Sequence, residues 1–124
     1  MARISIKSAK AKGRSAQQWV RDAILARFPM LEAGDVVSTQ MGAGGVDIVL
    51  SPKAKRLIPV SIEVKARATG FTPLYDYLEQ ADRKDGLEPV AFVKQDRRKM
   101  LAVIDAVALI DLLARDAERS LQGK

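Results

Sequence analysis

Asp47, Glu63 and Lys65 are the residues of this chain whose types and spacing suit a chemical reaction. Asp47 lies in the apolar segment 46–50, and the other two lie in the segment 58–67, where polar and apolar residues alternate. Both segments predict strands, and the strand period places Glu63 and Lys65 on one face, about 7 Å apart. If the two strands pair, Asp47 reaches the same face. Two carboxylates and an ammonium can together hold a divalent cation and promote attack on a phosphodiester.

Each of these residues has an expected part in that chemistry. Asp47 and Glu63 would bind Mg²⁺, with the carbonyl of Val64 as a further ligand, and Mn²⁺ can substitute. The ion lowers the pKa of a bound water, and Lys65 orients that water or neutralises the transition state. The bare spacing is common, so the opposing interpretation is a solvated strand face with Asp47 at a strand start.

The composition narrows the classes of site and partner. The 124 residues suit one domain, 1–124, and the net charge of +6 favours polyanionic partners. The chain contains no histidine and no cysteine, which excludes histidine bases, Ser-His-Asp triads, zincins, thiolate zinc sites and disulfides. Any metal must therefore have oxygen ligands, and no small-molecule cofactor is expected.

The sequence also carries an expectation about location. No apolar run approaches the length of a membrane span, and the basic segment 1–14 lacks the apolar core of a signal peptide. A membrane partner is therefore not expected. We expect a cytoplasmic protein, associated with the nucleoid or present in a phage-infected host cell.

The elements expected to position the three residues alternate between helices and strands. A first helix is predicted over 15–28, preceded by a basic arm at 1–13, with Ser15 as N-cap and Gln18 completing a capping box. Strands are predicted over 35–40, 46–50, 58–67, 90–94 and 100–104, a basic turn over 51–56, and further helices over 73–84 and 105–119. This order predicts an α/β domain whose mixed central sheet of about five strands is flanked by helices.

Basic residues outside this group are candidates for contacts with nucleic-acid phosphates. They lie in the arm, in the turn after the second strand and around the later motifs: Lys7, Lys10, Lys12, Arg14, Lys53, Lys55, Arg56, Arg67 and Arg83. A further cluster, 97–99, lies at the turn between the last two strands. Each cluster has a solvated surface as its alternative. No aromatic residue alternates with the basic runs, so a base-stacking platform is not expected, and Trp19, Phe28 and Phe92 are assigned to the core.

Two motifs resemble a known superfamily. Gly45-Val46-Asp47 followed by Ile62-Glu63-Val64-Lys65 resembles the signature of the PD-(D/E)XK, or restriction-endonuclease-like, nucleases, with Val46 in place of the proline. Within that superfamily the chain is similar to archaeal-type Holliday junction resolvases, including phage-borne relatives, over 12–104. The similarity includes the helix start at 12–18, the loop at 38–42 and the segment 77–81.

The resemblance implies a restriction-endonuclease-like core and a Mg²⁺-dependent endonuclease that resolves four-way DNA junctions by paired nicks, acting as a homodimer. Gln18 stands where the family carries a metal-assisting glutamate, so it is a candidate catalytic residue and a second metal ion is in question. Gln80 is a candidate DNA contact. The dimer would use the last helix or exposed strand edges. Alternatives are a nuclease of this fold that cuts flaps, nicks or duplex ends, a non-catalytic DNA-binding module, and an RNA-associated factor.

Overall fold

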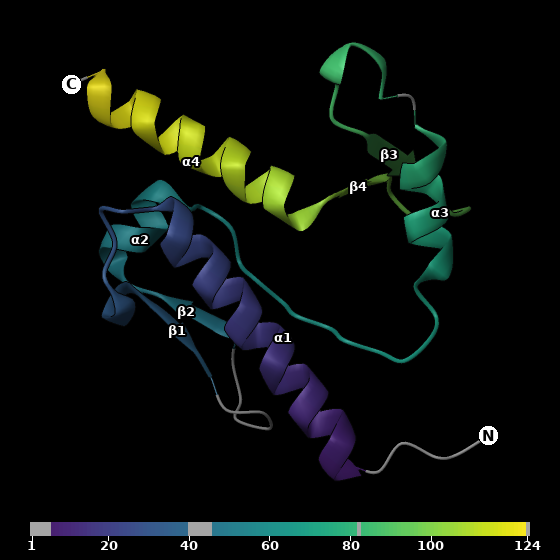
Figure 1. The fold of residues 1–124 in the computed structure, drawn as a ribbon, viewed down its shortest axis with the longest axis horizontal. Helices are drawn as coiled ribbons and strands as arrows, with labels where there is room; N and C mark the ends of the chain where they lie inside the picture. The colour runs from purple at the N-terminus through teal and green to yellow at the C-terminus, as the bar shows by residue number, and fades with distance from the viewer. Residues whose placement is uncertain (1–5, 40–45, 82, 124) are drawn as a thin grey trace. The chain divides into compact units, whose positions relative to one another are not determined.

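The structure is a computed structural model that describes residues 6–39, 46–81 and 83–123. The chain forms two compact units, one made of Met1–Arg67 with Ile110–Lys124 and the other of Ala68–Leu109. In the first unit, the long helix α1 lies against a short two-stranded sheet (Figure 1). The predicted functional residues Asp47, Glu63 and Lys65 all belong to this first unit.

The first unit contains three helices and two strands. Its elements in chain order are α1 (Ile6–Arg27), the 3-10 helix η1 (Ala33–Asp35), β1 (Val36–Ser38), β2 (Ile48–Leu50), α2 (Pro52–Leu57) and the part of α4 (Ala106–Gln122) from Ile110 onward. The strands β1 and β2 are antiparallel, with Val37 opposite Val49. An ion pair between Arg27 Nε and Asp111 Oδ1, at 2.6 Å, links α1 to α4.

Residues from the helices α1, α2 and α4 and from both strands meet in the core of the first unit. Phe28 and Val36 are fully buried, and Ile48 and Leu50 of β2 are buried while Val49 between them is exposed. The other core residues are Ile24, Leu31, Ala54, Ile58, Ile110 and Ala117. The alternation along β2 is that of a strand with one face on the core and one face toward solvent.

The predicted restriction-endonuclease-like core, with a mixed central sheet of about five strands, is wrong. The described residues form two separate antiparallel sheets of two strands each, β1–β2 and β3–β4. The segment 58–67 joins neither sheet, although its side chains alternate as predicted: Ile62, Val64 and Ala66 are half-buried and the polar residues between them are exposed. Alternation of apolar and polar residues shows which side chains face a core. An extended chain can place these side chains on a core without hydrogen-bonding its backbone to a neighbouring strand.

Two predicted boundaries in the first unit also need correction. The helix α1 begins at Ile6, so the described part of the predicted arm, 6–13, is helical, and Ser15 and Gln18 lie inside the helix. Alanine and lysine, which favour helices, dominate that stretch and extend the helix toward the N-terminus. The predicted basic turn at 51–56 contains the helix α2, which Ser51 caps by accepting the N–H of Ala54 at 3.1 Å.

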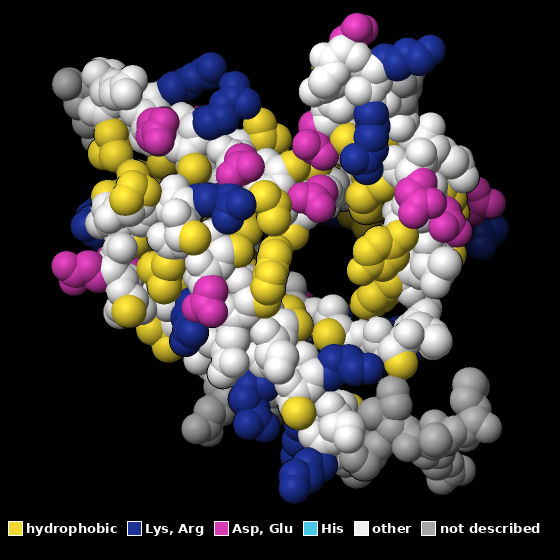
Figure 2. Space-filling model, in the orientation of Figure 1, with side chains coloured by type: hydrophobic (Ala, Val, Ile, Leu, Met, Phe, Trp, Pro, Cys, Tyr) yellow, Lys and Arg dark blue, Asp and Glu magenta, His cyan; other side chains and the backbone are white. Residues whose placement is uncertain are grey.

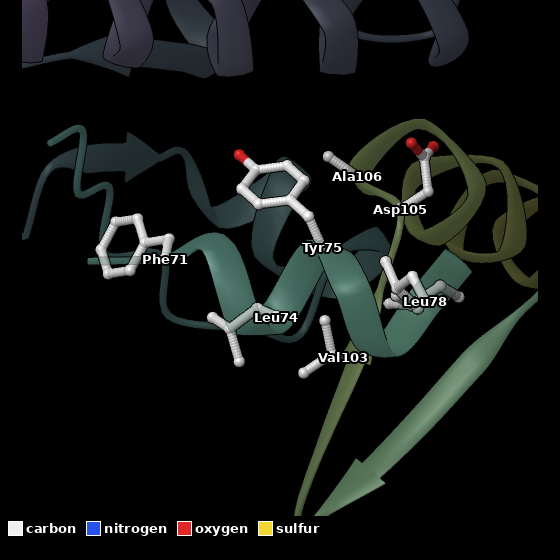
Figure 3. A pocket seen from close by; sticks show the side chains of 8 residues that line it. Phe71, Leu74, Tyr75, Leu78, Val103, Asp105 and Ala106 are labelled. Atoms are coloured by element: carbon white, nitrogen blue, oxygen red, sulfur yellow. The ribbon is translucent and has the colours of Figure 1, made fainter. Parts of the chain in front are cut away.

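The second unit packs one helix on a β-hairpin. It contains α3 (Thr72–Gln80), the 3-10 helix η2 (Lys84–Gly86), β3 (Val90–Val93) and β4 (Leu101–Ile104), and Phe92 faces Ala102 across the hairpin. Between α3 and the end of β4 lies an apolar hollow of about 420 Å³, into which Tyr75, Leu78 and Val103 contribute side chains (Figure 3). The predicted strands at 90–94 and 100–104 are confirmed to within one residue at each end.

Two of the three aromatic residues assigned to the core are not buried. Phe28 is fully buried, as predicted, but Trp19 is 48% exposed and Phe92 is 72% exposed. Trp19 lies on α1 next to the helix face that carries the buried Gln17 and Ile24, and outside that face. Phe92 projects from the strand face opposite to that of the half-buried Ala91 and Val93.

Candidate functional site

The carboxylate of Asp47 lies against the backbone between Glu63 and Lys65. Its Oδ2 accepts the backbone N–H of Val64 at 2.6 Å. The chain runs from β2 through the short helix α2 and then returns alongside β2. Leu50 of β2 and Ile58 of the returning segment line the same hollow. The two predicted segments therefore converge without forming a strand ladder, and the contact is made by a side chain.

Glu63 and Lys65 form an ion pair at the surface. Lys65 Nζ lies 3.1 Å from Glu63 Oε1, and the two side chains are 71% and 61% exposed, respectively. An ion pair this exposed contributes at most about 1 kcal/mol to stability. Both groups are consequently open to an incoming cation or phosphate, at little cost to the fold.

The end of β1 holds the backbone of Asp47. The N–H of Thr39 donates to the carbonyl of Asp47 at 3.0 Å, and the Thr39 hydroxyl lies 3.0 Å from the carbonyl of Val46 and 3.1 Å from that of Asp47. These bonds continue the pairing of β1 with β2 one residue beyond Ser38. Hydrogen bonds thus join the main chain of Asp47 to Thr39 and its carboxylate to the backbone of Val64.

Gln17 is a residue of this region that the sequence reasoning missed. Its side chain is 2% exposed, and its Oε1 accepts the hydroxyl of Ser38 at 3.1 Å. Gln18, the predicted candidate, is exposed. The signal was present: Gln17 precedes Ile24 by seven residues and Phe28 by eleven, which places all three on one face of a helix. The prediction selected Gln18 instead, because Gln18 stands where the resembled family carries a glutamate.

Three of the predicted basic residues form a stripe on α1. Lys7, Lys10 and Arg14 recur at helical spacing on one side and are exposed, whereas Lys12 lies about 200° around the helix from Lys10. Lys and Arg side chains gather over this N-terminal end of α1 in Figure 2. The basic stripe, defined as Lys7, Lys10 and Arg14, ends one turn before Gln17 and so leads toward the end of β1 that holds Asp47.

The remaining predicted phosphate contacts lie in varied surroundings. Lys53 donates its ammonium to the carbonyl of Met30 at 2.6 Å, which ties α2 to the turn after α1. Lys55 and Arg56 are exposed in the last turn of α2, where the helix dipole favours cations. Exposed residues also include Arg67 in the first unit and Gln80 and Arg83 in the second.

The oxygen donors around Asp47 fit a hard divalent cation that keeps several of its waters. Mg²⁺ is commonly held by one or two carboxylates together with water and phosphate oxygens. Asp47 and Glu63 provide that number, and no cluster of three or more Asp, Glu, His or Cys occurs among residues 6–39, 46–81 and 83–123.

Comparison with known protein families, curated proteins and solved structures finds no match to this chain. Within the part of the chain that the structure describes, no helix combines the length and apolarity needed to cross a bilayer.

Proposed function

We propose that the protein is a Mg²⁺-dependent DNA endonuclease that acts on branched DNA, with the four-way junction as its expected substrate. The observation that carries the proposal is the Asp47 carboxylate, 2.6 Å from the N–H of Val64 and so beside Glu63 and Lys65. Asp47 precedes Glu63 by 16 positions and Lys65 by 18, and its carboxylate contacts the backbone between these two residues. The basic stripe on α1 and the net charge of +6 suit a DNA backbone.

Each residue has a defined task in this proposal. The carboxylates of Asp47 and Glu63 would hold the Mg²⁺, with the carbonyl of Val64 as a further ligand. When bound, the ion would supply activation of a water molecule and neutralisation of charge on the phosphate. Lys65 provides positive charge for a phosphate oxygen. In the reaction, a water oxygen bonds to phosphorus, the bond to one ester oxygen breaks, and that oxygen takes up a proton.

A second candidate function is a DNA-binding module without catalysis. The ion pair between Glu63 and Lys65 favours it, because each charge already has a partner at 3.1 Å. Both functions predict binding to DNA, and only the first predicts cleavage.

The deciding experiment is cleavage of a labelled four-way junction beside a linear duplex, in Mg²⁺ or in EDTA. The wild type should cut paired strands of the junction only with Mg²⁺, and Glu63→Ala should lower the rate by about 100-fold or more. Glu118→Ala removes another exposed glutamate, on α4, and should cut like the wild type. Absence of cleavage on every DNA, with junction binding intact and unchanged in Glu63→Ala, would refute the nuclease and leave the binding module.

A further inference from the structure

The hairpin of the second unit exposes an aromatic side chain next to a cation. Phe92 is 72% exposed, and Lys94 follows it by two residues, so both project from the same face of the strand, about 7 Å apart. That spacing is comparable with the distance from a base to the phosphates of its own nucleotide. Among the described residues, Phe92 is the most exposed of the large hydrophobic side chains.

Phe92 lines an open groove with a second aromatic residue. The groove has a volume of about 490 Å³ and lies between the C-terminal part of α3 and the strand β3. Tyr77 and Gln80 of α3 form one wall, and residues 90–94 form the other. Tyr77 is itself 43% exposed. Two aromatic residues and one amide residue thus line the groove, and such side chains stack on and hydrogen-bond to nucleobases.

The groove continues into a cationic hollow at the tip of the hairpin. This hollow, of about 390 Å³, shares Val93 and Lys94 with the groove and adds Arg98 and Lys99. The tip turns tightly, with the N–H of Arg98 donating to the carbonyl of Gln95 at 3.0 Å and Arg97 at a φ of 64°. Residues 94–99 carry four cations against the single carboxylate of Asp96, so the tip attracts phosphate.

We propose that this aromatic groove and the cationic tip together bind a short single-stranded nucleic acid, with a base stacked on Phe92 or Tyr77 and its phosphates on Lys94, Arg98 and Lys99. Stacking accepts any base and the cations contact only phosphates, so the site has little sequence preference. The inference concerns binding within the second unit and does not depend on the proposed cleavage.

The test measures the fluorescence anisotropy of labelled oligo-dT and oligo-U in EDTA, where no cleavage occurs. Phe92→Leu and Tyr77→Ala should each weaken binding by about tenfold, and Phe92→Tyr should bind like the wild type. Tyr75→Ala is the matched control, because Tyr75 is 66% exposed but lies on the other side of α3, in the hollow of Figure 3. Arg98→Gln with Lys99→Gln should also weaken binding and flatten its dependence on salt.

Several outcomes would overturn the site. Wild-type affinity in both Phe92→Leu and Tyr77→Ala would remove the stacking role, and so would an equal loss in Tyr75→Ala. Failure of the wild type to bind either oligonucleotide would also refute it. Binding of one oligonucleotide or of both that weakens in Phe92→Leu and Tyr77→Ala but not in Tyr75→Ala supports the site. Because Phe92 is 72% exposed, its substitution should leave the fold intact, which far-UV circular dichroism checks.

Discussion

At the scale of single residues, the candidate site depends on how Asp47 is held. Its carbonyl is bonded to Thr39 and its carboxylate to the N–H of Val64, so its position links β1, β2 and the returning segment. Ser38, next to Thr39, is bonded in turn to the buried Gln17 of α1. A path of hydrogen bonds and one peptide link therefore leads from the helix to the carboxylate.

Gln17 gives the first prediction at this scale. Gln17→Leu removes the acceptor of the Ser38 hydroxyl in a buried place, and it should lower the free energy of unfolding by about 1–3 kcal/mol. Gln18→Leu, at the exposed neighbour, should change that free energy by less than about 0.5 kcal/mol. Urea denaturation followed by circular dichroism measures both. Equal effects of the two substitutions would contradict the structural role of Gln17.

The sequence identified residues that the fold brings into contact, but it did not predict the geometry of that contact. Asp47, Glu63 and Lys65 could be selected because charged residues interrupt apolar strand patterns, which is a local signal. Gln17 was missed because choosing between two adjacent glutamines requires the helix face to within about 100°. The true face passes through Phe28 and Ile24, and only tertiary packing shows that Trp19 is outside it.

At the scale of elements, one carboxylate joins η1 to the residue that caps α2. Asp35 accepts the N–H of Glu32 at 2.8 Å and the hydroxyl of Ser51 at 2.7 Å. These two hydrogen bonds, and the nearby charge of Lys53, hold the pKa of Asp35 below its usual value. Because Ser51 also caps α2, the ionised carboxylate of Asp35 connects η1 to α2.

The lowered pKa of Asp35 predicts how stability depends on pH. A carboxyl group with a lower pKa in the folded state stabilises the fold above its unfolded pKa, and this contribution is lost as the pH falls through the folded value. The unfolding free energy should therefore fall as the pH is lowered from 5 to 2. In Asp35→Asn this drop should be smaller, while Asp116→Asn should match the wild type. Parallel curves for all three proteins would contradict the assignment.

Elements also explain which parts of the fold were predictable. The hairpin at 90–104 and the helices α3 and α4 follow from local patterns, and they formed close to where they were expected. The five-stranded sheet required the segment 58–67 to pair with distant strands, and such pairing is set by tertiary contacts that no local pattern encodes. Ile62 and Val64 nevertheless pack against the core, as their alternation predicted.

The basic stripe gives a prediction for α1 as an element. Replacement of Lys7, Lys10 and Arg14 by Gln should weaken DNA binding and lower the slope of log affinity against log salt by about three units. Lys12→Gln, on another side of the same helix, should change the slope by much less. DNA-binding titrations between 50 and 200 mM salt measure this slope. A slope in the triple variant equal to that of the wild type would place the DNA elsewhere.

At the scale of the whole molecule, charge and the number of sites limit what one chain can do. The net charge of +6 over 124 residues favours DNA in general, without selecting its shape. One chain contributes one Asp47 and one Glu63, so it supplies ligands for a single proposed cleavage site. Paired nicks in opposed strands of a four-way junction need two such sites held at once.

The assembly state therefore tests the junction proposal as a whole. We expect sedimentation equilibrium, with and without a junction DNA, to give a protein mass of twice the 13.5 kDa of the chain, because a two-fold dimer presents two equal sites to two equivalent strands. A mixture of wild type with Glu63→Ala should then nick many junctions in one strand only. A monomer at all concentrations, on and off DNA, would be incompatible with paired cuts, and the substrate would then be one that needs a single cut, such as a flap or a nick.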